Sequence, residues 1–117
     1  MTSLNQKVIE ELRELEREGS PGFFAELIDL FLREGALHMA RLRESLSARD
    51  ARPFERSAHT LKGSCGNLGA QALSRICGEL QEIGQTADWA RAAEVFPRLE
   101  AEYRAVETEL LTERDRS

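Results

Sequence analysis

The sequence predicts an all-α protein, an antiparallel up-down four-helix bundle with a short N-terminal covering helix. Three observations support this prediction. Strong helix formers fill the chain between its breaks, whereas valine, which favours strands, occurs only at Val8, Val95 and Val106. The three prolines and eight glycines fall mostly at the breaks. Apolar residues recur at helical spacing and nowhere alternate with polar residues for the length of a strand.

The first two helices begin at recognisable capping signals. Ser3, with Gln6 three residues later, forms a capping-box pattern that begins a short helix, and Gly19 ends it. A Ser-Pro pair at 20–21 then supplies an N-cap and a first-turn proline for a long helix that extends to about residue 47. Gly35 lies within this long helix, where it could bend or split it.

Three further helices follow. Asp50 caps the third helix, and the glycine-rich segment 66–69 is a turn that ends it. The fourth helix closes at Gly84, and Asp88 caps the last one. Pro97 lies inside this last helix and is expected to kink it near residues 93–97. Because the connections are short, neighbouring helices are expected to run antiparallel.

Length and composition restrict the possible functions. The 117 residues fit one domain, with residues 1–19 as the covering helix and 20–113 as the bundle. The chain carries 16 basic and 21 acidic residues, a net charge of −5, which argues against nucleic-acid binding. No apolar run approaches the ~18 residues of a membrane span, and the N-terminus lacks the apolar core of an export signal. We therefore expect a cytoplasmic protein with neither nucleic-acid nor membrane partners.

The two cysteines, one of the two histidines and the tryptophan are expected to be structural. Cys65 and Cys77 do not make a disulfide framework, so reduced thiols are the simpler interpretation. If the helical hairpin turns near residue 68, Cys65 is level with about residue 72 and does not face Cys77. His38 is expected to be a packed or boundary histidine, and Trp89 a core or rim aromatic.

One exposed histidine lies on the third helix. The apolar residues of this helix are spaced by four and three and form one buried seam: Phe54, Ala58, Leu61, Cys65 and Leu68. At about 100° per residue, His59 lies roughly 130° from the centre of the seam and faces water. The residues on or beside the same stripe are Arg52, Glu55, Arg56, Lys62, Gly63 and Gly66.

Two features of this stripe are hard to explain by folding alone. Gly63 lies inside a helix, where glycine costs about 1 kcal/mol relative to alanine, and it leaves room for a partner one turn from His59. The stripe is also positive on a chain that is negative overall. Neutral imidazole is a nucleophile near pH 7, and neighbouring cations would stabilise a phosphoryl group placed on it. A lone exposed histidine is nevertheless often an ordinary surface residue.

The segment 58–70, Ala-His-Thr-Leu-Lys-Gly-Ser-Cys-Gly-Asn-Leu-Gly-Ala, resembles the signature of histidine-containing phosphotransfer (HPt) domains of two-component phosphorelays. That signature is a histidine, one residue, Leu-Lys-Gly-Ser, and then Leu-Gly-Ala four residues on. The resemblance extends along almost the whole chain, through FFAELIDLFL at 23–32 and ELQE at 79–82.

The resemblance implies a phosphoryl carrier. His59 would be the phosphorylated residue, Lys62 would hold the phosphoryl oxygens, and Gly63 would keep the approach clear for a receiver domain. Arg56 is expected to assist Lys62, and the partner-access surface is expected to include Arg52, Glu55 and Gly66. The chain would accept the group from a receiver aspartate and pass it to another receiver, with no kinase activity or nucleotide site of its own.

The same resemblance implies the partners. These are response-regulator receiver domains and a hybrid sensor histidine kinase, in a cytoplasmic and bacterial pathway, with this chain a monomer. No cofactor or metal site is expected on the chain, because only Glu55 is acidic near His59; the divalent metal would be held by the receiver. The receiver-docking surface is expected on the covering helix around Val8, Ile9 and Leu12, and beside His59.

Three alternatives remain open. A helical interaction module could bind receivers without phosphotransfer. A sensor-kinase dimerisation domain also presents a histidine on a helix, but there an acidic residue and soon a proline usually follow, where this chain has Thr60 and Gly63. A metal-binding bundle needs inward Glu and His ligands at helical spacing, and the seams contain almost none.

Overall fold

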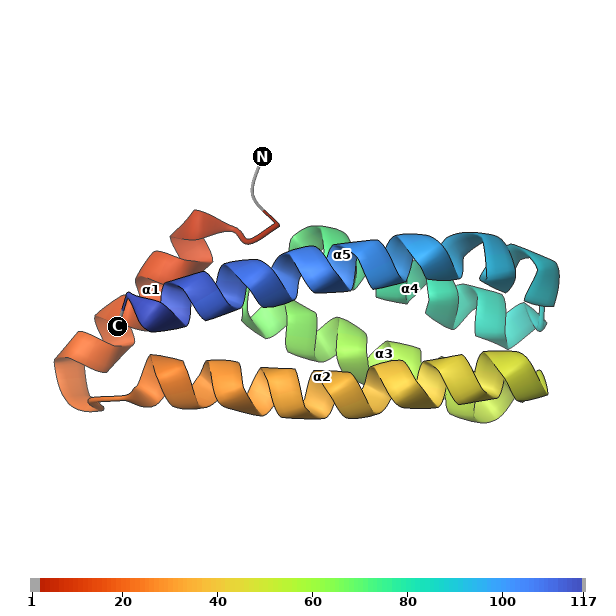
Figure 1. Cartoon of the computed structure of the whole chain (residues 1–117), viewed down its shortest axis with the longest axis horizontal. Helices are drawn as coiled ribbons and strands as arrows, with labels where there is room; N and C mark the ends of the chain where they lie inside the picture. The colour runs from red at the N-terminus through yellow and green to blue at the C-terminus, as the bar shows by residue number, and fades with distance from the viewer. Residues whose placement is uncertain (1–2, 117) are drawn as a thin grey trace.

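The computed structural model describes residues 3–116, and within them the chain forms five helices and no strand. The helices are α1 (Gln6–Gly19), α2 (Phe23–Ala48), α3 (Ala51–Asn67), α4 (Gln71–Thr86) and α5 (Trp89–Asp115). Helices α2 to α5 run up and down as an antiparallel bundle, in which α2 and α5 are long and α3 and α4 form a shorter hairpin (Figure 1). Together with α1, the molecule measures 46 × 25 × 18 Å. The predicted fold class is confirmed.

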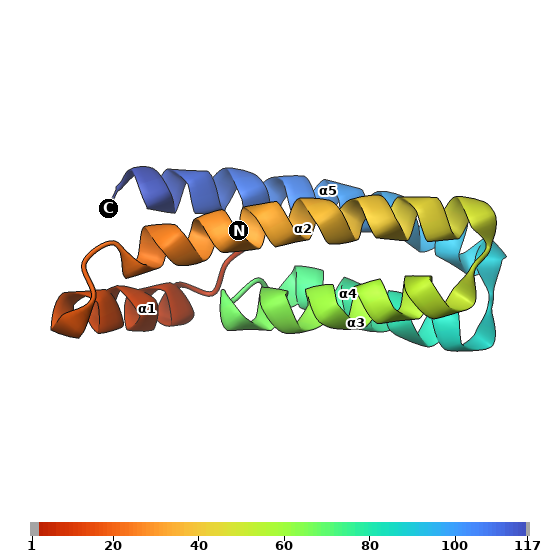
Figure 2. The ribbon, with the colours of Figure 1, turned by 90° about the horizontal axis from the view of Figure 1, so that it is seen from below.

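Helices α2 and α5 are longer than the α3–α4 hairpin, and α1 packs against the part of them that the hairpin does not reach. It lies in line with the hairpin, on the same side of α2 (Figure 2). The Asn5 amide donates to the carbonyl of Gly69 in the α3–α4 turn at 2.8 Å. Gly69 has a φ of +76°, and a Cβ there would lie 2.9 Å from Val8 Cβ, so only glycine allows this close contact. The predicted covering helix is therefore confirmed.

The first helix begins later than the capping-box pattern predicts. Its N-cap is Asn5 rather than Ser3, because the Asn5 side chain accepts from the backbone amides of Lys7 and Val8. Asparagine is one of the best N-cap residues, which explains why the helix begins at Asn5 and not two residues earlier at Ser3.

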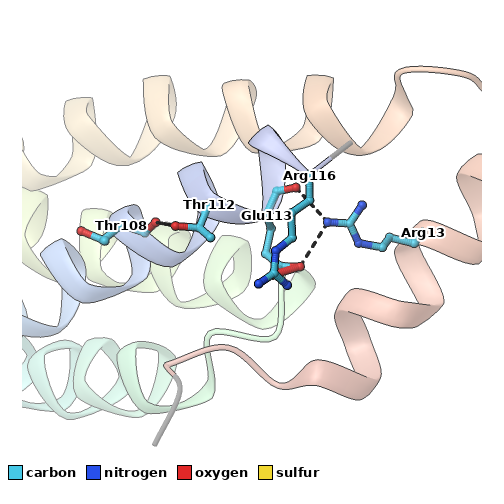
Figure 3. Close-up of polar contacts among 5 residues, drawn as sticks. All are labelled: Arg13, Thr108, Thr112, Glu113 and Arg116. Atoms are coloured by element: carbon cyan, nitrogen blue, oxygen red, sulfur yellow. Dashed lines mark hydrogen bonds and ion pairs between the residues drawn. The ribbon is translucent and has the colours of Figure 1, made fainter.

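An arginine joins α1 to the C-terminal end of α5. The Arg13 guanidinium donates to the Glu113 carbonyl at 2.8 Å and to its carboxylate at 3.1 Å (Figure 3). It also lies 4.7 Å from the centroid of the Phe24 ring. A cation at the last carbonyls of a helix stabilises that terminus. Because Glu113 is buried, this contact holds α1 against α5 and α2 together.

The second helix also begins later than its sequence signal. It starts at Phe23, after Gly22 in the left-handed region with φ +82°, whereas the Ser-Pro pair at 20–21 was expected to begin it. The Phe24 amide instead donates to the Glu16 carboxylate of α1 at 2.9 Å. A side chain from the preceding helix thus supplies the cap that Ser20 was expected to supply.

Neither interior breaker interrupts its helix. Helix α2 is continuous through Gly35, and α5 is continuous through the exposed Pro97. Gly35 is buried against α5, and a Cβ there would lie 2.6 Å from the Tyr103 hydroxyl. Burial raises the pKa of Tyr103 to about 12, and its ring stacks on Phe31 at 6.2 Å. Gly35 therefore does not split α2, and it permits the close packing of this helix against Tyr103.

Replacing Gly35 with alanine should destabilise the bundle by about 1–3 kcal/mol, because the added methyl group overlaps a ring that is held in the core. Denaturant-induced unfolding measures the change. Gly63→Ala is the matched control, since nothing lies within 4 Å of a Cβ there, and it should gain up to about 1 kcal/mol from helix propensity. Equal stability of the two alanine variants would show that Tyr103 moves aside without cost.

The α3–α4 hairpin is centred near residue 70, not 68. Its cross-helix contacts include His59 with Gln81 and Glu55 with Gln85. The prediction that Cys65 does not face Cys77 is therefore wrong. Both thiols are free and fully buried, and the hydrogen bond with Cys77, together with burial, raises the pKa of Cys65.

The predictions for His38 and Trp89 agree with the fold, whereas α4 runs past Gly84, where it was predicted to close, and ends at Thr86. His38 is buried, and desolvation lowers its pKa, with the charge of Arg41 acting in the same direction. Trp89 is partly buried and packs edge-on against Phe54, with ring centroids 5.5 Å apart. Within residues 3–116, no helix combines the length and the apolar character needed to cross a membrane.

Candidate functional site

Helix α3 presents His59 to solvent. Its opposite face forms the predicted seam, and the α3 seam residues that are fully buried are Phe54, Ala58, Leu61 and Cys65. His59 is exposed, and so are the stripe residues Arg52, Arg56, Lys62, Gly63 and Gly66. The predicted separation of a buried seam from an exposed histidine stripe is confirmed by this burial pattern.

Four of the stripe residues meet in one shallow pocket. This pocket has a volume of about 450 Å³ and is lined by Arg52, Glu55, Arg56, His59 and Gln81. Lys62 and the two glycines of the stripe do not line it. The pocket thus brings His59 together with two arginines toward the N-terminal end of α3.

Gln81 of α4 contacts the imidazole directly. Its Oε1 lies 3.3 Å from His59 Nδ1. An acceptor oxygen at Nδ1 favours the tautomer of the neutral ring that carries its proton on Nδ1 and its lone pair on Nε2. Sequence reasoning missed Gln81 as a site residue, because identifying it requires the register of the α3–α4 hairpin.

Lys62 leans onto α4, as its position on the helix flank predicts. Its Cε and Nζ lie 3.5 and 3.6 Å from the place that a Cβ of Gly78 would occupy. The Ser74 hydroxyl donates to the Lys62 carbonyl at 3.1 Å. The lysine side chain is therefore laid along α4, one turn of α3 beyond His59.

Glu55 is the one carboxylate among the residues of the pocket, and it is engaged with α4. Its Oε1 accepts from Gln85 Nε2 at 3.2 Å. Its Cα lies 3.3 Å from the place of a Gly84 Cβ, so the two helices approach closely here. Glu55 therefore helps to join α3 and α4 as well as lining the pocket.

The cations around His59 have no anionic partner. Among residues 3–116, neither Arg52, Arg56 nor Lys62 forms an ion pair. Between α4 and α5, by contrast, Arg91 and Arg98 of α5 both pair with one glutamate of α4, Glu79. Positive charge that is not neutralised locally is available to an incoming anion.

The two glycines of the stripe are not required by packing. A Cβ at Gly63 or at Gly66 would have nothing within 4 Å, whereas one at Gly84 would lie 3.2 Å from Phe54. The space above the stripe is therefore open to a partner. Within the described residues 3–116, no group of three or more His, Cys, Asp or Glu side chains could hold a metal ion.

The sequence profile of the Hpt domain family matches residues 26–109, which is most of the chain. The chain belongs to the Hpt domain family. Its similarity to Histidine-containing phosphotransfer protein 2 of Arabidopsis thaliana is 28% identity over 103 residues, 86% of this chain and 66% of that protein. Phosphorelay intermediate protein rdeA of Dictyostelium discoideum is 26% identical over 89 residues, 76% of this chain and 35% of that protein.

A solved structure of a related Hpt protein has the same fold. The crystal structure of histidine-containing phosphotransfer protein B (HptB) from Pseudomonas aeruginosa PAO1 superimposes with a TM-score of 0.86 at 28% identity, covering 98% of this chain and 96% of that one. The Hpt relatives come from a plant, Dictyostelium and a bacterium, so their likeness does not by itself indicate a bacterial source. This chain spans just under two thirds of the length of the Arabidopsis protein.

Proposed function

We propose that this Hpt chain carries a phosphoryl group in a phosphorelay, accepting it on His59 from a receiver aspartyl phosphate and passing it to a second receiver. The observation that carries the proposal is the exposed His59, beside three cations that form no ion pair within residues 3–116 and two glycines that packing does not require. Membership of the Hpt domain family, and relatives named as phosphotransfer and phosphorelay proteins, support it.

The transfer step follows from the imidazole geometry. Gln81 favours the tautomer with Nδ1 protonated, so Nε2 attacks the phosphorus in line with the bond that breaks. A P–N bond forms as the P–O bond to the aspartate breaks, and the carboxylate leaves with the electron pair. The reverse attack, by a carboxylate of the second receiver, returns the imidazole to its neutral form.

The cations supply charge stabilisation. Lys62 and Arg56 would donate to the phosphoryl oxygens, and Arg52 would add positive potential at the far end of the pocket. The proposal assigns no cofactor to this chain; the divalent metal would be held by the receiver. All four bundle helices come from one chain, which supports a monomer. Its proposed partners are receivers and a hybrid sensor kinase, as for a phosphorelay carrier in the cytoplasm.

The direct test is phosphoryl transfer from a panel of ³²P-labelled phospho-receivers. We expect label to appear on this chain at a rate that depends on the receiver, and to be acid-labile and base-stable, as phosphohistidine is. A chain that binds a phospho-receiver but never takes label would instead be an interaction module, and the proposal would be wrong.

The receiver would dock on the α2 side of the stripe. An apolar pocket of about 130 Å³ lies between α2 and the C-terminal part of α3, lined by Leu27, Leu30, Phe31, Glu34, Ser64, Asn67 and Leu68. It borders the stripe, because the lining residue Asn67 lies one turn beyond Gly63 on the same exposed face of α3. The surface expected around Val8, Ile9 and Leu12 needs correction, since Ile9 is only 1% exposed and belongs to the core.

Leu30→Glu should weaken receiver binding about tenfold without destabilising the bundle, because Leu30 is 46% exposed at the edge of the apolar pocket. Affinity for a receiver that transfers label measures the change. Leu111→Glu is the control, since Leu111 is similarly exposed (43%) on α5, and it should bind normally. Equal weakening by both variants would mean that net charge, not this pocket, governs binding.

A further inference from the structure

One stripe of α4 faces the functional residues of α3. Its members are spaced by four, three and four residues, and each contacts a different part of α3: Ser74 the Lys62 carbonyl, Gly78 the Lys62 side chain, Gln81 the His59 ring and Gln85 the Glu55 carboxylate. Three of the four make hydrogen bonds. Gly78 contributes only the absence of a side chain.

Gly78 is not explained by the packing of the two helix backbones. Glycine inside a helix costs about 1 kcal/mol relative to alanine. At Gly84 that cost is offset by close approach, since a Cβ there would lie 3.3 Å from the Glu55 Cα. At Gly78 the three nearest atoms are all at the end of one side chain, Lys62 Cε, Cδ and Nζ, at 3.5 to 3.6 Å. The end of the lysine side chain therefore lies directly over Gly78, at van der Waals distance from the place of a Cβ, where any side chain longer than alanine would collide with it.

We propose that Gly78 is a positioning residue for Lys62: the notch that it leaves in α4 holds the lysine side chain beside His59. This inference rests on the proposed phosphoryl-carrier function of His59. Through Gly78, helix α4 would help to place the Lys62 ammonium, which stabilises the transferred phosphoryl group.

The notch acts by limiting where the ammonium can go. A lysine side chain on a helix surface samples many rotamers, and ordering it costs up to about 2 kcal/mol. Methylene groups laid in a groove keep the charged end exposed while restricting its position. Gly78 is three residues before Gln81 on the same face of α4, so the lysine and the histidine lean on adjacent turns of one helix.

The size of the side chain at residue 78 distinguishes positioning from a structural role. An alanine Cβ would make ordinary van der Waals contact with Lys62 at 3.5 to 3.6 Å, so Gly78→Ala should leave the lysine in place. Gly78→Leu fills the notch and displaces the flexible end of Lys62 into solvent. Both variants should be at least as stable as the wild type, because both residues form helix better than glycine.

The experiment measures the rate of transfer from a labelled phospho-receiver to five proteins: wild type, Gly78→Ala, Gly78→Leu, Lys62→Ala and the double variant Lys62→Ala/Gly78→Leu. We expect Gly78→Leu and Lys62→Ala each to slow transfer about fivefold, the scale of one partly exposed charge interaction. Gly78→Ala should match the wild type, and the double variant should be no slower than Lys62→Ala. If the slowing in the double variant is the product of the two single effects, the leucine blocks docking rather than displacing Lys62. If Gly78→Leu transfers at the wild-type rate, the notch does not affect Lys62. Either result overturns the proposal.

A second measurement separates this inference from the proposed function. NMR relaxation of the Lys62 Cε methylene, without any phosphoryl donor, should show restricted motion in the wild type and in Gly78→Ala, and motion as free as that of the exposed Lys7 in Gly78→Leu. If Lys62 is equally mobile in all three, the notch does not position it. If Lys62 is restricted as expected but no receiver labels the wild type, the phosphoryl-carrier function is wrong while the contact with Gly78 stands.

Discussion

Replacing His59 with glutamine should abolish phosphoryl acceptance, with a loss too large to measure above background. Glutamine keeps a polar side chain of similar length, but its amide nitrogen cannot form a stable P–N bond with the incoming phosphorus. The fold should be unaffected, because His59 is exposed and its hydrogen bond with Gln81 is worth about 1 kcal/mol. Label transfer from a phospho-receiver, compared with the unfolding midpoint, measures both effects.

The second histidine is the natural control for this prediction. His38 is buried on α2, so no receiver can reach its ring. His38→Gln should therefore retain acid-labile label, even though placing an amide in the core lowers stability. Label that persists on His59→Gln would place the acceptor at another residue and contradict the assignment of His59.

The sequence contains most of what is needed to find His59 and the bundle. The apolar spacing of the seam on α3 fixes which face is buried, so the exposure of His59, Arg56 and Gly63 follows from helix geometry alone. The covering helix could likewise be predicted from its own apolar stripe. These features depend on periodicity within one helix, and periodicity is local information.

The contacts between helices could not be predicted, because they depend on register. A hairpin centred on residue 68 rather than 70 moves the partner of each α3 residue by about one turn of α4. That difference separates a Cys65 that misses Cys77 from a buried Cys65 whose pKa is raised by the neighbouring Cys77. The same difference hides Gln81 and Gly78, whose roles exist only opposite His59 and Lys62.

Gly35 shows the other limit of local reasoning. A glycine in a helix interior has the same appearance in sequence whether it bends the helix, admits a neighbouring side chain or clears an approach for a partner. In the structure Gly35 admits Tyr103, Gly78 admits Lys62, and Gly63 faces open space. Only the atoms around the missing Cβ distinguish the three.

Gly63→Leu should slow phosphoryl transfer at least about tenfold while leaving the bundle as stable as before or more so. A Cβ at residue 63 meets nothing within 4 Å, and leucine forms helix better than glycine by up to about 1 kcal/mol. The free energy of unfolding should therefore rise. The rate of phosphoryl transfer should fall, because the leucine lies one turn from His59, where the receiver must approach. A displacement of about 1 Å in a reacting pair can cost about a hundredfold in rate.

Two further variants identify the cause. Gly63→Ala adds a single methyl group and should slow transfer only slightly, while Gly66→Leu places the same bulk one turn further from His59 and should slow it less than Gly63→Leu. A graded effect that falls with distance from His59 indicates steric exclusion of the receiver. If instead Gly63→Leu transfers normally, the receiver approaches from the Arg52 side, and the open glycine surface serves neither folding nor docking. Opposite signs for stability and transfer in one variant would show that this glycine is kept for the partner and not for the fold.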